Sequence, residues 1–281
     1  MTAQHPVYEI LAKEIAYIFD NPEFDKPVNE FLCNTGYALG QAFSAPNIEF
    51  RAFGLLPTVA GRSPVLVLRG TNKAIDDIAR DCHKAIGLSQ FIKYQNELAT
   101  WLIHATQTTH QKAVIVGHCL GGAIAQIIAT ELIDWIKEVV TFSSPGTSRD
   151  IAAKFIQHGG ANLDVTHYVI DGDIISLAGE AFIAGKVIIQ CFRDRTLNPL
   201  HNIDERQPFW RLLSNPPDGL AQTEISVQTL SHPTFTFFST DYLEFLAGYY
   251  KINPEVALCL TSRGKFEALR KAGFSLPTIS C

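Results

Sequence analysis

The sequence of 281 residues lacks an excess of basic residues, and this absence excludes one class of function. Lys and Arg together number 23 against 28 Asp and Glu, which leaves a formal net charge of −5. The basic residues are scattered and form no polybasic run. Because nucleic acids and anionic membrane surfaces are bound through clustered positive charge, we expect no nucleic-acid partner.

Motifs that hold metals, nucleotides or flavins are also missing. The six cysteines form no C-x-x-C pair and no His/Cys spacing typical of a metal site. The sequence contains neither a G-x-G-x-x-G fingerprint nor a P-loop. We therefore expect no metal and no cofactor. Because a free cysteine packs as a small hydrophobe, we expect five reduced core thiols: Cys33, Cys82, Cys191, Cys259 and Cys281.

No hydrophobic run is long enough to cross a bilayer. The most apolar window, near 113–130, is interrupted by a histidine, a glutamine and three glycines. The N-terminus lacks the apolar core of a signal peptide, because Glu9, Lys13 and Glu14 break it. Its apolar residues recur instead at helical spacing and predict an amphipathic surface helix. We expect a soluble, cytoplasmic protein, which is compatible with peripheral lipid contact and with export by a route that needs no signal peptide.

What the sequence does contain is an alternation of short β-branched runs with helical stretches. Strands are predicted at 48–55, 64–70, 113–117, 138–142, 165–170, 186–192 and 224–230. Helices are predicted at 5–20, 26–42, 75–87, 89–108, 121–136, 148–158, 203–213, 241–251 and 263–272. This alternation predicts an α/β fold with a mostly parallel sheet, and the strands, apolar on both faces, belong between two helical layers. We predict a single domain over 1–281, with N-terminal helices in 1–45 and a C-terminal cap or helical region in 196–281.

The segment AVIVGHCLGG, residues 113–122, is the strongest functional signal. It has the outline of G-x-S-x-G between a predicted strand and a predicted helix, with Cys119 in the nucleophile position. Glycines beside a nucleophile leave room for a tight, strained turn. The helix N-terminus favours a thiolate and an oxyanion, and the backbone N–H of Leu120 can donate to that oxyanion. We interpret Cys119 as a nucleophile rather than as a packed core cysteine.

This segment resembles the GHSLGGALA-type segment of class 3 (fungal-type) lipases in the α/β-hydrolase superfamily. Three further segments resemble that family in the same order. LRGT (68–71) is similar to F-R-G-T/S, TFSSPGT (141–147) to T-F-G-x-P, and DGDIISLAG (171–179) to N-D-x-V-P-x-L-P. The resemblance covers about residues 64–180 and implies a single-domain α/β-hydrolase fold.

The resemblance also implies roles for two residues. Thr71 ends the LRGT segment and corresponds to the residue that helps to form the oxyanion hole, while Asp173 corresponds to the catalytic aspartate. The sequence departs from the family at three points. Leu68 replaces the usual aromatic residue, no P-x-L-P follows Asp173, and Cys119 stands where the family has serine.

A nucleophile of this kind needs a base, and the base needs an acid that orients it. In α/β-hydrolases the chain order is nucleophile, acid, histidine. Asp173 is the predicted acid, and we interpret its neighbour Asp171 as a turn residue. Of the nine histidines only His201 and His232 follow Asp173. His201 lies in the first loop after the next predicted strand. His232 comes after a further predicted strand, and this position is similar to that of the catalytic histidine in the fungal lipases. We favour His201 slightly and keep His232 as the alternative.

The expected activity is hydrolysis of a carboxylic ester, of a lipid or another small molecule, by a lipase- or esterase-like enzyme. A thiol at position 119 allows three interpretations: a natural cysteine hydrolase, an inactive fold retained for binding, or a serine hydrolase whose serine has been replaced. A Cys-dependent thioesterase or acyltransferase and a non-catalytic binding protein are the alternative functions. Residues 203–213 fit either a mobile lid or an ordinary packed helix.

Overall fold

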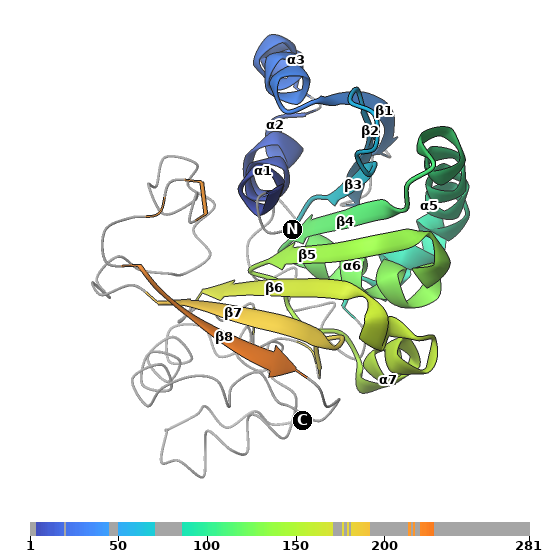
Figure 1. Ribbon diagram of the computed structural model, residues 1–281, viewed down its shortest axis with the longest axis vertical. Coiled ribbons are helices and arrows are strands. Elements are labelled where there is room, and N and C mark those ends of the chain that lie inside the picture. The colour runs from blue at the N-terminus through green and yellow to red at the C-terminus, as the bar shows by residue number, and fades with distance from the viewer. Residues whose placement is uncertain are drawn as a thin grey trace, which may run out of the picture.

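The computed structural model has one eight-stranded sheet, whose strands follow each other in chain order from β1 to β8 (Figure 1). It describes residues 4–19, 21–44, 50–70, 86–170, 176, 179, 181–191, 213–214, 216 and 220–227. The strands are β1 (Tyr37–Ser44), β2 (Arg51–Pro57), β3 (Val65–Leu68), β4 (Ala113–His118), β5 (Ile136–Phe142), β6 (Asp164–Ile170), β7 (Gly185–Cys191) and β8 (Ala221–Val227). Strands β3 to β7 run parallel, and the antiparallel strands lie at the two edges. The predicted α/β fold with a mostly parallel sheet is confirmed.

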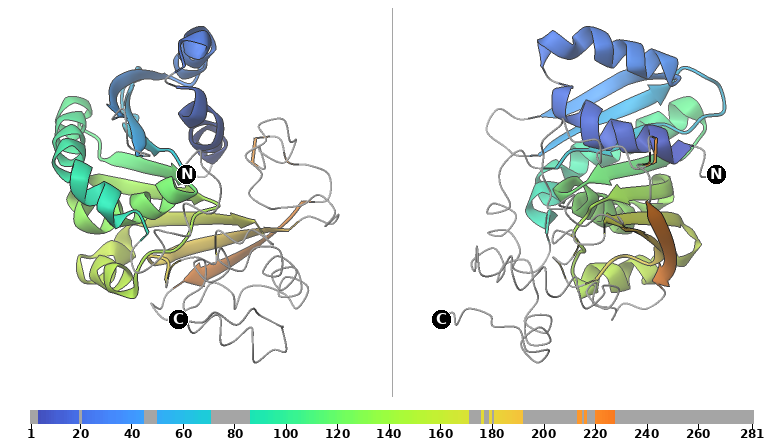
Figure 2. Two further views of the ribbon diagram at one scale, coloured as in Figure 1. Left: turned by 180° about the vertical axis from the view of Figure 1, so that it is seen from behind. Right: turned by 90° about the vertical axis from the view of Figure 1, so that its left-hand side faces the viewer.

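Helices cover both faces of this sheet (Figure 2). One face carries α5 (Leu88–Thr109), α6 (Leu120–Glu131) and α7 (Arg149–Gln157). The other carries an N-terminal helix made of α1 (His5–Ile10), the π-helical turn η2 (Leu11–Ile15) and α2 (Ala16–Ile18). The remaining helical elements are α3 (Asp25–Asn34) and the short 3₁₀ turns η3 (Pro22–Phe24), η4 (Ile133–Trp135) and η5 (Gly160–Asn162). None of the described helices has both the length and the apolar character that a membrane span requires.

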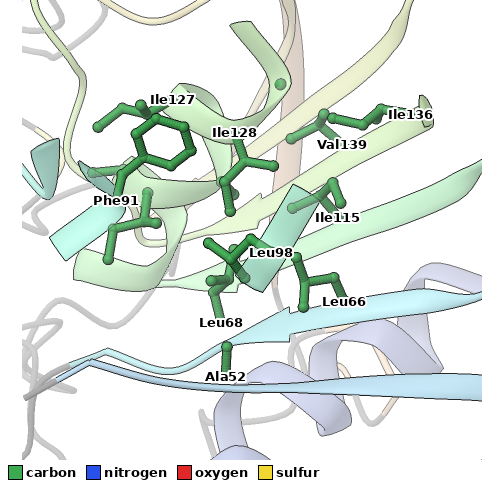
Figure 3. Close-up of a cluster of buried hydrophobic side chains, with 14 of the residues drawn as sticks. Ala52, Leu66, Leu68, Phe91, Leu98, Ile115, Ile127, Ile128, Ile136 and Val139 are labelled. Atoms are coloured by element: carbon green, nitrogen blue, oxygen red, sulfur yellow. The ribbon is translucent and has the colours of Figure 1, made fainter. Parts of the chain in front are cut away.

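Alternation along the central strands creates two hydrophobic cores, one on each face. In β3, Leu66 and Leu68 pack with α5 and α6, while Val65 and Val67 pack with the N-terminal helix. Figure 3 shows Leu66, Leu68 and Ile115 from neighbouring strands against side chains of α5 and α6. Successive side chains of a strand point to opposite faces, so strands buried on both faces must be apolar throughout. The prediction of buried strands between two helical layers is therefore confirmed.

The predicted helix at 26–42 is wrong in its second half. Helix α3 ends at Asn34, and Gly36 has a φ of +78°, a conformation typical of the glycine that follows a helix. Residues 37–44 then form β1, which pairs antiparallel with β2. Pairing with β2 overrides the weak local preference, so the predicted helical segment 1–45 also holds a strand. Cys33, expected in the core, is exposed on α3.

The N-terminal helix buries charged side chains as well as the apolar stripe that the sequence predicted. Glu9 and Lys13 are only 1% and 3% exposed and form an ion pair with Nζ 2.9 Å from Oε1. The second carboxylate oxygen of Glu9 accepts the backbone N–H groups of Leu213, at 2.8 Å, and Ser214, at 3.3 Å. A surface helix would have left these charges in water. The prediction was wrong because the segment 213–214 covers the side of the helix that carries Glu9.

Two further predicted elements have different boundaries in the structure. The helix expected at 121–136 is shorter, because α6 ends at Glu131 and η4 leads directly into β5. The strand expected at 224–230 begins earlier, as β8 at Ala221. Most of the predicted helix at 75–87, the segment 203–212 and the helices at 241–251 and 263–272 lie outside the described residues.

One histidine of the sheet is fully enclosed. His167 on β6 is 0% exposed, with Nδ1 2.8 Å from the Thr141 hydroxyl and Nε2 3.2 Å from the backbone oxygen of Ile183. Burial lowers the pKa of His167 to about 4, against a smaller opposing effect of the hydrogen bond to Ile183. The imidazole is therefore neutral in the folded protein at neutral pH.

This lowered pKa predicts a specific loss of stability in acid. Between pH 6.5 and 4 the unfolded chain binds a proton at His167 that the folded chain does not, so the free energy of unfolding falls as the pH falls. The loss approaches about 3 kcal/mol near pH 4 and is absent above pH 7. Urea unfolding of His167→Gln should lack this part of the pH dependence. His104→Gln, a change at an exposed histidine of α5, should keep it, and identical slopes for the two variants would contradict the assignment.

Candidate active site

The turn between β4 and α6 holds Cys119 in a strained backbone conformation. Its φ is +53° and its ψ is −127°, a combination of backbone angles that residues other than glycine rarely adopt. Backbone strain of this kind costs about 1–3 kcal/mol and persists where neighbouring contacts enforce it. The Cys119 N–H donates to the Phe142 carbonyl at 3.0 Å, and its own carbonyl accepts from Gly122 N–H at 2.8 Å. These contacts fix the backbone on both sides of the thiol.

The glycines around Cys119 are required because backbone segments meet there. A Cβ on Gly117 would lie 2.3 Å from the carbonyl oxygen of Gly121. A Cβ on Gly121 would lie 2.2 Å from the carbonyl oxygen of Leu68. A Cβ on Gly122 would lie 2.5 Å from the side chain of Ser144. The steric reason inferred from the sequence for the G-x-C-x-G-G pattern is present in the structure.

The thiol lies at the N-terminus of a 12-residue helix. Cys119 is the residue before the first turn of α6, and within the described residues its side chain makes no capping hydrogen bond. Leu120 contributes the first backbone N–H of that helix, which has no acceptor inside the helix. Because the N-terminus of a helix carries a partial positive charge, this end favours negative charge on sulfur or on a substrate oxygen. Cys119 itself is 1% exposed.

The segment that follows β3 packs directly against Cys119. A Cβ on Gly70 would lie 2.8 Å from Cβ of Cys119 and 2.6 Å from the hydroxyl oxygen of Tyr17. Strand β3 pairs in parallel with β4, so both strands end at the same edge of the sheet. Gly70 is thus the point at which the LRGT segment touches Cys119. Thr71, the predicted oxyanion residue, is the next residue and lies outside the described residues.

The remaining predicted triad residues also lie outside the described residues. Asp173 and its alternative Asp171 follow β6, which ends at Ile170 and pairs in parallel with β5. Both histidines, His201 and His232, belong to the undescribed part of the chain. Cys119 and Leu120 are therefore the two predicted site residues that the structure places.

Two residues beside Cys119 were not foreseen from the sequence. The Tyr17 hydroxyl lies 2.8 Å from Nδ1 of His118, and the guanidinium of Arg69 lies over the Tyr17 ring, 5.5 Å from its centroid. Burial raises the pKa of Tyr17 well above its usual range, the neighbouring Cys119 raises it further, and Arg69 lowers it. Burial and the nearby Arg51 lower the pKa of Arg69. Nothing in the sequence indicated that Tyr17 belongs to the site, because it lies 101 residues before His118.

Gln126 supports the turn from inside α6. Its Nε2 donates to the carbonyl of Pro145 at 2.9 Å and to the Ser144 hydroxyl at 3.2 Å. Its Oε1 accepts the backbone N–H of Ile183 at 3.2 Å. The side chain of Gln126 is fully buried, and these bonds link α6 to Ser144 and Pro145 of the TFSSPGT segment. Gln126 is the last residue of the GHCLGGAIAQ segment, and this position is the sequence feature that could have identified it as part of the site.

The donors that metals prefer do not gather in the described residues. No group of three His, Cys, Asp or Glu side chains in this part of the chain lies close enough together to hold an ion. The chemistry of the described site is that of a thiol, a helix N-terminus and backbone N–H groups.

A strained strand-to-helix turn at the carboxyl edge of a mostly parallel sheet, with helices on both faces, is typical of the α/β-hydrolase fold. Residues 31–203, more than half of the chain, match the family described as phospholipase-like, Tle-like phospholipase domain. The chain belongs to this family. The class 3 lipase resemblance drawn from the sequence is consistent with this result.

Solved lipases share the fold at low sequence identity. The Rhizomucor miehei lipase in its propeptide complex is 12% identical, with a TM-score of 0.57, over 92% of this chain and 76% of that chain. Lipase II from Rhizopus niveus is 15% identical, with a TM-score of 0.52, over 69% and 82% of the two chains. A triacylglycerol lipase with a serine protease triad as its catalytic centre is 14% identical, with a TM-score of 0.52, over 68% and 80%. No curated protein matches the chain.

Proposed function

We propose that this protein hydrolyses an acyl ester of a phospholipid or related lipid, with Cys119 as the nucleophile. The observation that carries the proposal is the strained Cys119 backbone, with φ at +53°, in a glycine-lined turn at the N-terminus of α6. The phospholipase-like family and the lipase neighbours support a lipid ester as the substrate. His201, or His232 in its place, is the proposed base, and Asp173 is the acid that orients it.

The proposed reaction has two half-reactions. In the first, the base takes the proton of the thiol, and Sγ of Cys119 attacks the ester carbonyl carbon. The resulting oxyanion accepts hydrogen bonds from the Leu120 N–H and from Thr71. Its collapse breaks the carbon–oxygen bond, and the leaving alcohol takes the proton from the histidine. In the second half-reaction, water attacks the thioester with the histidine again as base, releasing the carboxylic acid and the thiol.

Acyl transfer is the second candidate function. Cys119 is 1% exposed, and a thioester shielded from water can pass its acyl group to another alcohol or thiol. The first half-reaction is the same in both cases. The two functions differ only in the molecule that attacks the thioester, so product analysis separates them.

The proposal is tested with p-nitrophenyl esters of increasing chain length and with phosphatidylcholine vesicles. The protein should release p-nitrophenol and fatty acid, and intact mass after brief exposure should increase by one acyl group less one hydrogen, located on Cys119. Adding glycerol as a second nucleophile identifies acyl transfer, because an acylglycerol then replaces part of the free acid. If only Cys119→Ser turns over, a thiol nucleophile is excluded. If neither protein turns over or acylates, the hydrolase proposal fails and a binding function is favoured.

A further inference from the structure

The N-terminal helix reaches the active-site edge of the sheet through one side chain. Tyr17, in α2, contacts both segments that bound the candidate active site. Its hydroxyl lies 2.8 Å from Nδ1 of His118, the residue before Cys119. The same phenol oxygen packs against Gly70, the residue before Thr71, and lies 2.6 Å from the point where a Cβ of Gly70 would stand. One hydroxyl group thereby joins the ends of β3 and β4.

The hydrogen-bonding roles of this hydroxyl follow from its chemistry. A phenol has one proton to donate and can also accept a hydrogen bond. Burial raises the pKa of Tyr17, so the phenol keeps its proton and stays uncharged beside His118 and Gly70.

The contacts around Tyr17 leave little freedom for movement. The Tyr17 hydroxyl and Cβ of Cys119 lie 2.6 and 2.8 Å from the point where a Cβ of Gly70 would stand, so all three groups meet there. The ring packs edge-on against His118, with the centroids 5.8 Å apart, and Arg69 lies over its face. Any shift of Gly70 relative to Cys119 therefore has to disturb its packing against the Tyr17 hydroxyl, which the hydrogen bond to His118 holds in place.

We propose that Tyr17 is a positioning residue, which fixes Gly70 relative to Cys119. The inference rests on the proposed function, in which Cys119 is the nucleophile and the residue that follows Gly70 in the sequence helps to hold the oxyanion. A misplacement of about 1 Å at a reacting centre can lower a rate by roughly 100-fold. Tyr17 acts through Gly70 and His118 rather than on the substrate.

The test uses Tyr17→Phe, which removes only the hydroxyl. We expect kcat for a p-nitrophenyl ester to fall by roughly 10- to 100-fold while KM stays within about twofold, because the spacing and not the substrate contacts changes. Amide hydrogen exchange should become faster in the peptides that contain Gly70 and Cys119. Tyr8→Phe is the matched control. Tyr8 is buried in the same helix, with its ring 6.0 Å from that of His5, so loss of its hydroxyl should leave kcat unchanged.

The two measurements distinguish failure of the inference from failure of the proposed function. Unchanged exchange at both peptides in Tyr17→Phe overturns the inference, whatever the activity. Faster exchange with unchanged kcat also overturns it, as does a loss of kcat of equal size in Tyr8→Phe. If the unmodified protein has no esterase activity, the proposed function fails. Hydrogen exchange then still decides whether Tyr17 holds the two segments together.

Discussion

Replacing Cys119 by alanine is expected to abolish ester hydrolysis and acyl-adduct formation. The thiol is the nucleophile of the proposed reaction, and loss of a nucleophile lowers kcat by at least about 1,000-fold in enzymes of this kind. The fold should persist, because alanine is smaller than cysteine and the turn is held by backbone contacts to Phe142 and Gly122. Circular dichroism and thermal unfolding establish that the variant is folded before activity is compared.

The matched control for this prediction is Cys33→Ala. Cys33 and Cys119 are both free cysteines, and Cys33 is exposed on α3 while Cys119 is buried in the turn. Loss of a surface thiol should leave both the rate and the adduct unchanged. If Cys119→Ala retains the activity, or if the acyl group is found on Cys33, Cys119 is not the nucleophile.

The largest loss of stability is expected from Lys13→Met. Lys13 and Glu9 form an ion pair that is buried on both sides, so removal of the lysine takes away the cation that lies 2.9 Å from a buried carboxylate. Breaking such a pair costs about 3–5 kcal/mol. Urea unfolding should report this decrease in the free energy of unfolding. A second substitution, Glu9→Gln, should recover much of the loss, because it removes the charge and keeps an acceptor for the Leu213 and Ser214 N–H groups.

Lys26→Met provides the comparison at an exposed site. Lys26 and Glu30 have the same four-residue spacing on α3, but their side chains are 86% and 63% exposed and the charged atoms are 3.9 Å apart. Exposed pairs at this spacing contribute at most about 0.5 kcal/mol. Equal losses in Lys13→Met and Lys26→Met would show that burial of the first pair has no energetic consequence.

Local sequence was sufficient to predict the central strands and the turn that contains Cys119. The β-branched runs predicted at 64–70 and 113–117 correspond to β3 and β4, because strands buried on both faces need apolar residues at every position. The glycines of the segment 113–122 indicated a tight turn, and only hydrogen fits where those backbones meet. Here a short stretch of chain carries both the steric requirement and the residues that meet it.

Contacts between distant segments decided the rest. Residues 37–44 became a strand because β2 offers them hydrogen-bonding partners, which a helical pattern in 26–42 does not reveal. The sequence predicted that Glu9 and Lys13 lie at the surface. A helical period shows which residues share a face of a helix, but it does not show what covers that face.

Tyr17 illustrates the same limit at the active site. The sequence by itself determined the fold class, most of the central strands and the turn that contains Cys119. Only the tertiary structure brought Tyr17 to the ends of β3 and β4, where it contacts Gly70 and His118. The physical reason is that the turn depends on local sterics, whereas the surroundings of the turn depend on which residues the folded sheet places beside it.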